Sequence, residues 1–203
     1  MNKELLTKQQ TSLKIIKKVE LLNLNEAYQK CLYWFFSYPD DEVGLNELSR
    51  VLKISKTNAR KVVLKLVKEN FLFKKELGKV WRIFCNKKHP YNFNLKIGFN
   101  FQMIYQSGIL EDIHKEVPGV RAIILFGSYR KGDDTENSDI DLAVEIFGNE
   151  RLKISEFGKI ENFGYRKNVP VNLYIFSRKK IDLNLFSNIA NGIVLDGFLE
   201  VNP

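Results

Sequence analysis

Cysteine and histidine are scarce in this chain, and their positions exclude several kinds of site. Among 203 residues there are two cysteines, Cys31 and Cys85, and two histidines, His89 and His114. A disulfide framework needs more cysteines than this, and neither pair has the spacing of zinc ligands. We therefore expect two reduced and mostly buried thiols in a cytoplasmic protein, and no metal site that uses the histidines.

Long apolar runs are also missing. The longest one near the N-terminus covers residues 31–36, whereas a membrane-spanning helix needs about 18 or more apolar residues. Residues 1–25 are rich in lysine and lack an uninterrupted apolar core, so they do not resemble a secretory signal. These absences favour a soluble, cytoplasmic chain with no membrane partner, and its length allows one large domain or two small ones.

Charge is distributed unevenly along the chain. Residues 1–88 carry a formal net charge of +10 and residues 89–203 one of −2, so the first half accounts for the whole excess of +8. This asymmetry predicts a basic half that binds a polyanion and a second half with a different task. We expect a basic domain over residues 1–88, a connecting helical segment over 89–117 and a second domain over 118–203.

The apolar pattern of the first half predicts helices followed by a hairpin. A leading helix is expected within residues 1–22, and its residues 3–22 could join two copies of the chain in a homodimer. Further helices are predicted over residues 26–36, 45–52 and 56–70, and Ser55 is a good N-cap for the last of these. Two strands, 71–76 and 80–85, are expected around Gly78.

Basic side chains gather on the third of these helices and on the hairpin, an order of elements that resembles a winged helix-turn-helix domain over roughly residues 25–86. The resemblance implies that this helix enters the major groove of duplex DNA while the hairpin touches the backbone or minor groove. The side chains expected to contact DNA lie within residues 45–85 and are Lys56, Thr57, Asn58, Arg60, Lys61, Lys65, Lys74, Lys75, Lys79 and Arg82. RNA binding and a structural or protein-binding role remain alternatives.

The second half predicts an α+β domain with a small mixed sheet. Continuous apolar runs favour strands over residues 120–126, 139–147, 169–176 and 193–201. Helices are expected over 151–163 and 181–191, and over 93–116 as two helices that break at Ser107-Gly108. The strand 139–147 is placed in the centre of the sheet.

A glycine turn and two aspartates are the most informative motif. Gly127-Ser128 is followed by ten residues and then by Asp139-Ile140-Asp141, which suggests a strand, a tight turn, a loop and a second strand. Two residues apart on a strand, the carboxylates project from the same face. Beside a turn with free backbone N–H groups, they can hold Mg²⁺ against a triphosphate.

This motif resembles that of the DNA polymerase β-like nucleotidyltransferases in their minimal form. The matching residues are Gly127, Ser128, Gly132, Ser138, Asp139 and Asp141. The resemblance implies that Gly127 and Ser128 hold the phosphates of a nucleoside triphosphate, most plausibly ATP, with help from Arg130 and Lys131. It also implies that Asp139 and Asp141 bind two Mg²⁺ or Mn²⁺ ions. With the basic first half, the chain looks like prokaryotic, especially archaeal, winged-helix and nucleotidyltransferase fusions.

One position departs from the family pattern. The family places a third acid on a later strand, where this chain has Asn172. Asparagine can ligate a metal through its carbonyl oxygen, but it brings no charge and cannot accept a proton as a carboxylate does. Glu145 could substitute, because strand alternation puts it on the face of Asp139 and Asp141. Three nearby acids are expected to be solvated loop residues: Asp133, Asp134 and Glu136.

Three functions follow from these features. The first is Mg²⁺-dependent transfer of a nucleotidyl group to a hydroxyl of a protein or nucleic acid, and the resemblance implies an antitoxin-like protein acting on a HEPN-domain toxin. The second is a non-catalytic, DNA-binding transcriptional regulator that senses nucleotide or binds a partner, which Asn172 favours. The third is an RNA-directed transferase.

Overall fold

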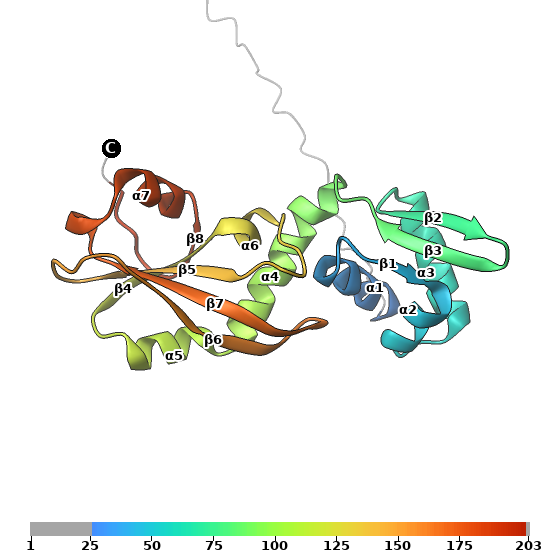
Figure 1. Ribbon diagram of the computed structural model, residues 1–203, viewed down its shortest axis with the longest axis horizontal. Coiled ribbons are helices and arrows are strands. Elements are labelled where there is room, and N and C mark those ends of the chain that lie inside the picture. The colour runs from blue at the N-terminus through green and yellow to red at the C-terminus, as the bar shows by residue number, and fades with distance from the viewer. Residues whose placement is uncertain (1–25, 202–203) are drawn as a thin grey trace, which may run out of the picture.

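The computed structural model describes residues 26–201, which form two parts connected through helix α4 (Figure 1). The helix expected within residues 1–22, and the dimer contact assigned to it, lie outside these residues. The first part contains α1 (Glu26–Ser37), β1 (Glu42–Gly44), α2 (Leu45–Val51), α3 (Lys56–Lys68), β2 (Leu72–Leu77) and β3 (Val80–Cys85). The three helices and the hairpin predicted here are confirmed to within two residues at most ends.

Strand β1 was not predicted, because three residues are too few to show the alternation of a strand. It pairs antiparallel with β3, with Val43 opposite Ile83, and gives a sheet of order β1-β3-β2. Helix α3 begins as expected: the Ser55 hydroxyl accepts a hydrogen bond from the Asn58 backbone N–H at 3.2 Å. Its apolar residues Ala59 and Leu66 are buried beneath the sheet and α1.

Both cysteines are free thiols inside this part, as predicted. Burial raises the pKa of Cys31 far above its usual range and that of Cys85 to about 11. Because the thiolate is the reactive form, we expect 5,5′-dithiobis(2-nitrobenzoate) at pH 8 to modify the folded protein at least about a hundredfold more slowly than the protein in guanidinium. Rapid modification of one thiol in the folded state would show that the core around it opens.

The second part contains a short turn of helix, η1 (Pro90–Phe93), and a five-stranded sheet with its helices. Its elements are α4 (Leu95–Gln106), α5 (Ile109–Glu116), β4 (Val120–Phe126), α6 (Gly127–Lys131), β5 (Ile140–Ile146), β6 (Lys153–Phe163), β7 (Arg166–Phe176), η2 (Arg178–Lys180), α7 (Leu183–Ala190) and β8 (Ile193–Gly197). The strand order is β6-β7-β5-β4-β8, with β5 parallel to β7 and the other neighbours antiparallel. The predicted α+β class, the mixed sheet and the central place of the aspartate strand are confirmed. Among the described helices, none is both long and apolar enough to cross a bilayer.

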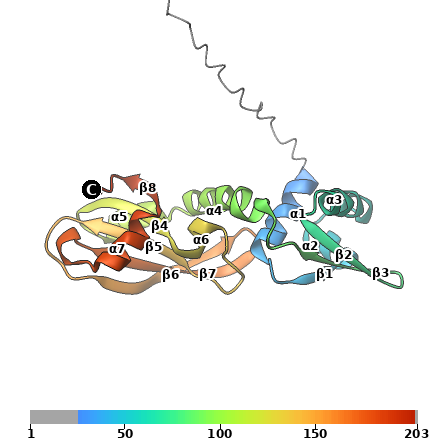
Figure 2. The same ribbon diagram turned by 90° about the horizontal axis from the view of Figure 1, so that it is seen from above.

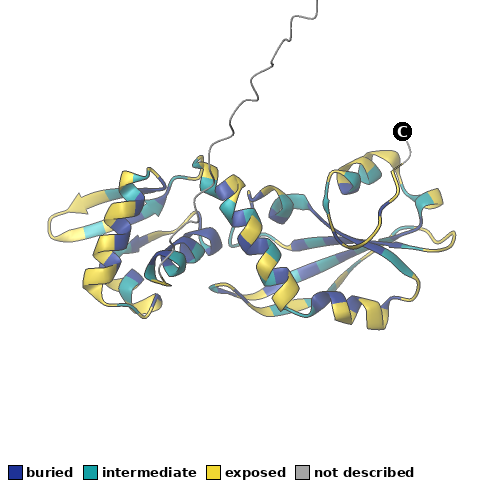
Figure 3. Cartoon of the chain, turned by 180° about the vertical axis from the view of Figure 1, so that it is seen from behind, coloured by how far each residue is buried: buried dark blue, intermediate teal, exposed yellow. Residues whose placement is uncertain are grey.

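The two faces of the sheet are covered differently. Ile140, Leu142 and Val144 of β5 are buried in the core that includes α4 and α5. The opposite face is covered over part of its area by α7, where Ala143 packs in a smaller cluster with Ile189. Figure 3 shows the buried residues, in dark blue, along the strands and on the inner sides of these helices. The face that carries Asp141 is therefore open beyond the end of α7.

The helix predicted over residues 151–163 is wrong, because these residues form strand β6. Apolar residues recur at every third position, Ile154, Phe157, Ile160 and Phe163, which imitates a helical period. In the structure a bulge adds one residue, Phe157, between Glu156 and Gly158. After the bulge, odd- and even-numbered side chains exchange the faces of the strand on which they lie. The strand then turns at Gly164 into β7.

The two parts share one continuous core. Phe99 of α4 stacks on Tyr33 of α1 with ring centroids 4.6 Å apart, and Figures 1 and 2 place α1 beside the end of α4. The Tyr38 hydroxyl also donates to the Tyr165 carbonyl at 2.8 Å, which joins α1 to the tip of the β6–β7 hairpin. The division of the chain at residues 88 and 117 stays a prediction.

Candidate functional site

The two aspartates lie at the open end of the central strand. Asp139 directly precedes β5 and is exposed, while Asp141 is half-buried on the face that α7 leaves open. Their neighbours Ile140 and Leu142 point into the opposite core and fix the register of the strand. The prediction that the two carboxylates share a face of a central strand therefore agrees with the structure.

Gly127 brings the turn against the second aspartate. It follows β4 with φ of +71°, and a Cβ atom at this position would lie 2.5 Å from Asp141 Oδ2. Only glycine combines this left-handed backbone with so close an approach. In place of the expected tight turn, Gly127 begins the short helix α6, which carries Ser128, Arg130 and Lys131.

Asn172 reaches the same place from the neighbouring strand. It is opposite Asp141 in the parallel pairing of β5 and β7, and its Nδ2 donates to Asp139 Oδ2 at 3.4 Å. Burial raises the pKa of Asp141, and the charge of Asp139 raises it further, while hydrogen bonds with Asn172 and Tyr174 lower it. Tyr174 was missed by the sequence analysis, although it stands two residues after Asn172 on the same face.

The other acids do not complete the site. Glu145 is buried at the far end of β5, where its Oε1 lies 3.4 Å from Arg121 and 3.1 Å from Arg178, so its proposed role as the third acid is not supported. The solvated-loop expectation is wrong for Asp134, which is buried and paired with Lys96 at 3.1 Å. It holds for Asp133, which is exposed.

A hollow of about 260 Å³ opens beside Gly127. It is lined by Phe126, Gly127, Arg130, Lys131, Asn188 and Asn191. The structure thus brings the three predicted phosphate-binding positions Gly127, Arg130 and Lys131 together with two amides, Asn188 in α7 and Asn191 directly after it. The amides were not predicted as site residues. Their spacing, three apart on a predicted helix, was the available signal, because such residues share one face.

The donor set suits a divalent cation of the Mg²⁺ type, which prefers oxygen ligands from one or two carboxylates. Asp139 and Asp141 supply two carboxylates, and the carbonyl of Asn172 can add a neutral oxygen. Within residues 26–201 no group of three or more histidine, cysteine or acidic side chains could hold a metal. The residues therefore fit a metal held with two negative charges where the family pattern has three.

The predicted DNA-contacting residues lie on more than one face of the first part. Lys56 and Arg60 line a hollow of about 370 Å³ together with Lys79, Arg82 and Arg50. Other members of the set lie elsewhere. Asn58 and Lys61 line a hollow beside α1, and Lys65 lies over the ring of Tyr28. On the hairpin, Lys74 lies over the ring of Trp81 and Lys75 over the ring of Phe84. Thr57 is exposed. Lys74 is also paired with Glu76.

Two comparisons with known proteins bear on the second part. Residues 109–195 match the family described as Polymerase beta, Nucleotidyltransferase, and this match includes both aspartates and Asn172. Over 49 residues the chain is 47% identical to the Methanocaldococcus jannaschii protein named Putative protein adenylyltransferase MJ1379. That similarity covers 24% of this chain and 45% of the relative. Residues 109–195 are therefore a polymerase β-like nucleotidyltransferase domain, whereas the winged-helix interpretation of residues 25–86 stays a prediction.

Proposed function

We propose that this protein transfers the AMP group of ATP to a hydroxyl of a protein or nucleic acid, using the nucleotidyltransferase domain of residues 109–195. The observation that carries the proposal is the approach of Gly127 to Asp141, which sets the turn of α6 against the carboxylates. The name of the similar M. jannaschii protein, a putative protein adenylyltransferase, supports ATP as the donor and a protein as the acceptor. A HEPN-domain toxin remains the partner that we propose on the family resemblance.

The reaction can be assigned to the residues present. The acceptor oxygen forms a bond to the α-phosphorus, the bond from that phosphorus to the bridging oxygen breaks, and pyrophosphate leaves with the electron pair. Asp139, which is exposed, or a water molecule takes the hydroxyl proton, because an amide such as Asn172 cannot. Arg130 and Lys131 lie in the wall of the hollow, where their charges would neutralise phosphate oxygens of the bound nucleotide. A divalent cation held by Asp139, Asp141 and the Asn172 carbonyl would neutralise the triphosphate and lower the pKa of the acceptor hydroxyl.

Transfer is tested with α-³²P-labelled ATP, Mg²⁺ or Mn²⁺, and a lysate of the source cell. We expect label to appear on one macromolecule and to be lost with the Asp139→Ala/Asp141→Ala variant. Protease or nuclease treatment then tells whether the acceptor is a protein or a nucleic acid. Absence of label, with ATP still bound, would favour the alternative in which the domain only senses nucleotide for a DNA-binding regulator.

We also propose that roughly residues 25–86 form a winged helix-turn-helix that binds duplex DNA. The observation that favours it is the hollow between α3 and the hairpin, whose lining includes Arg50, Lys56, Arg60, Lys79 and Arg82. Trp81, which also lines the hollow, lies under the guanidinium of Arg60, 4.8 Å from the ring centroid, and this contact holds the charge in place. The acids near these five cations are Glu47 in the lining, Glu42 paired with Arg82, and Glu76, which interacts with Arg60, so the hollow keeps a positive excess.

DNA binding predicts a characteristic dependence on salt. Removal of one phosphate contact by Lys56→Ala or Arg60→Ala should weaken binding to duplexes of different sequence alike and reduce the slope of log K against log [salt] by about 1. Lys153→Ala removes an exposed lysine from β6 and serves as the control. Fluorescence anisotropy between 50 and 200 mM salt gives the slopes. Equal slopes for all three variants would place the nucleic-acid surface elsewhere, and tighter binding to a structured RNA would favour RNA.

A further inference from the structure

A cluster of buried polar side chains lies next to the site but outside it. Lys96 is 1% exposed, Asn100 0%, Asp134 3% and Arg166 6%. Buried charges of this kind are costly unless they are paired and hydrogen-bonded. They come from α4, from the loop after α6 and from the start of β7, so the cluster joins three segments that are distant in sequence.

Helix α4 holds one end of the loop that leads to the aspartates. Lys96 Nζ donates to the backbone carbonyl of Asp134 and lies 3.1 Å from its carboxylate Oδ2. Asn100 Nδ2 donates both to Asp134 Oδ1 at 2.8 Å and to the Tyr129 carbonyl at 3.1 Å. The same helix therefore fixes α6, which carries the phosphate-binding positions, and residue 134 of the loop.

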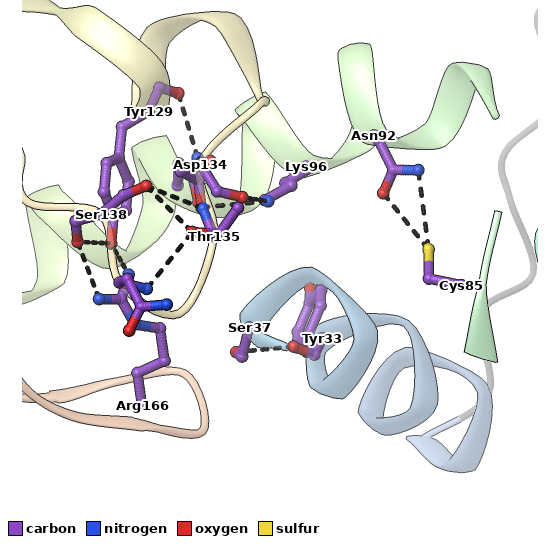
Figure 4. Close-up of polar contacts among 12 residues, drawn as sticks. Tyr33, Ser37, Cys85, Asn92, Lys96, Tyr129, Asp134, Thr135, Ser138 and Arg166 are labelled. Carbon is purple, nitrogen blue, oxygen red and sulfur yellow. Dashed lines mark hydrogen bonds and ion pairs between the residues drawn. The ribbon is translucent and has the colours of Figure 1, made fainter. Parts of the chain in front are cut away.

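Arg166 holds the other end of that loop. Its Nη2 donates to the carbonyl of Ser138 at 2.8 Å, and its Nη1 donates to the Tyr129 hydroxyl (Figure 4). Ser138 directly precedes Asp139, and its Oγ accepts a hydrogen bond from the Thr135 N–H at 2.9 Å. One guanidinium thus links the residue before the first aspartate to α6.

The first part of the chain supports this arginine. Tyr165 is its neighbour at the hairpin tip, and the Tyr165 N–H donates to Ser37 Oγ at 3.3 Å while its carbonyl accepts from the Tyr38 hydroxyl. Both partners belong to the end of α1 and the residue after it. The position of Arg166 therefore depends on contacts with both parts of the protein.

We propose that Arg166, with Lys96 and Asn100, is a positioning residue that keeps Asp139 and Asp141 in register with the Gly127–Ser128 turn. This inference rests on the proposed function for its effect on nucleotide. None of the three residues lines the hollow beside Gly127, so they act on the carboxylates through the loop of residues 132–138. The carboxylates and the turn belong to different segments, and metal-dependent binding of ATP needs both at once.

Calorimetric titration of ATP, in Mg²⁺ and again in EDTA, tests the proposal on the full chain. The quantity compared is the ratio of ATP affinity in Mg²⁺ to ATP affinity in EDTA. In Arg166→Met this ratio should be about 10- to 100-fold smaller than in the wild type, as is typical for residues that orient metal ligands. Binding in EDTA should stay within about twofold, because Asn100 still holds α6 through the Tyr129 carbonyl and so keeps Ser128, Arg130 and Lys131 in place. Arg166→Lys, which keeps one donor, should recover part of the loss, and Tyr129→Phe gives a milder version that removes one hydroxyl.

Arg178→Met is the matched control. Arg178 is a partly buried arginine that pairs with the carboxylate of Glu145 at the opposite end of β5, whereas Arg166 donates to a carbonyl and a hydroxyl. The Arg178→Met variant should lower the melting temperature as Arg166→Met does, without changing the effect of Mg²⁺ on ATP binding. The proposal would be overturned if Arg166→Met and Arg178→Met reduced the effect of Mg²⁺ on ATP binding equally. It would also be overturned if Arg166→Met weakened ATP binding equally with and without Mg²⁺.

Hydrogen exchange separates this proposal from the proposed function. The amides of residues 134–140 should exchange faster in Arg166→Met than in Arg178→Met, whether or not nucleotide binds. Unchanged exchange there would overturn the positioning role. If instead Asp139→Ala/Asp141→Ala binds ATP as the wild type does in Mg²⁺, the proposed function fails while the exchange result stands by itself.

Discussion

Replacing Asn172 with aspartate is expected to raise the rate of nucleotidyl transfer by about 10²- to 10⁴-fold, the usual worth of a positioned general base. Asn172 lies opposite Asp141 and 3.4 Å from Asp139 Oδ2, so a carboxylate at this position would face both aspartates. It would add the third negative charge of the family pattern and a group able to take the acceptor proton. The initial rate of label transfer from α-³²P-ATP in Mg²⁺ gives the comparison.

Stability provides a second sign of the same change. Three carboxylates crowded together repel one another, so Asn172→Asp should melt at a lower temperature than the wild type in EDTA and recover in Mg²⁺. Asn162→Asp is the control, since it adds the same charge on the exposed side of the neighbouring strand β6, away from the site. A slower Asn172→Asp enzyme with tighter Mg²⁺ binding would show that the amide is adapted to this site and does not limit it.

Replacing Gly127 with alanine is expected to reduce Mg²⁺-dependent ATP binding and transfer by at least about 10²-fold, the cost of displacing reacting groups by an ångström. The new methyl group would lie 2.5 Å from Asp141 Oδ2, and φ of +71° is strained for any residue with a Cβ atom. Either the aspartate or the turn must move. The loss should be larger in Mg²⁺ than in EDTA, because the carboxylate is the group displaced.

Gly98→Ala makes the same chemical change at a harmless position. Gly98 is an exposed residue of α4, and nothing lies within 4 Å of its added Cβ atom. This variant should bind and react as the wild type does and be slightly more stable, because alanine favours the helix. Wild-type binding by Gly127→Ala would refute the view that the contact between the turn and Asp141 builds the site.

Much of the fold and the centre of the site follow from the sequence because they rest on local signals. The strand before Gly127, the aspartate strand and the helix capped by Ser55 each have a clear apolar period or a cap. The pairing of Asp139 and Asp141 on one face needs only the alternation of a strand. The comparison of the second part with the nucleotidyltransferase family agrees with that motif.

The rest depends on contacts between distant segments, which one sequence does not reveal. The bulge at Phe157 gives β6 a helix-like period, and only pairing with β7 makes it a strand. Asp134 is charged and lies in a polar stretch, so the sequence predicted a solvated residue, yet it is buried against Lys96. Asn188 and Asn191 join the hollow only because α7 packs over the sheet beside α6.

The parallel pairing of β5 with β7 determines when the site is assembled during folding. In the sequence, all of β6 separates β5 from β7, although β6 is at the edge of the sheet. The β6–β7 hairpin joins neighbouring residues and can close within about 1–10 μs, whereas the pairing of β5 with β7 must close a longer loop. Asp141 meets Asn172 only in that later step. The site is therefore complete only after β5 has joined the hairpin, and a metal that binds the finished site would act mainly by slowing unfolding.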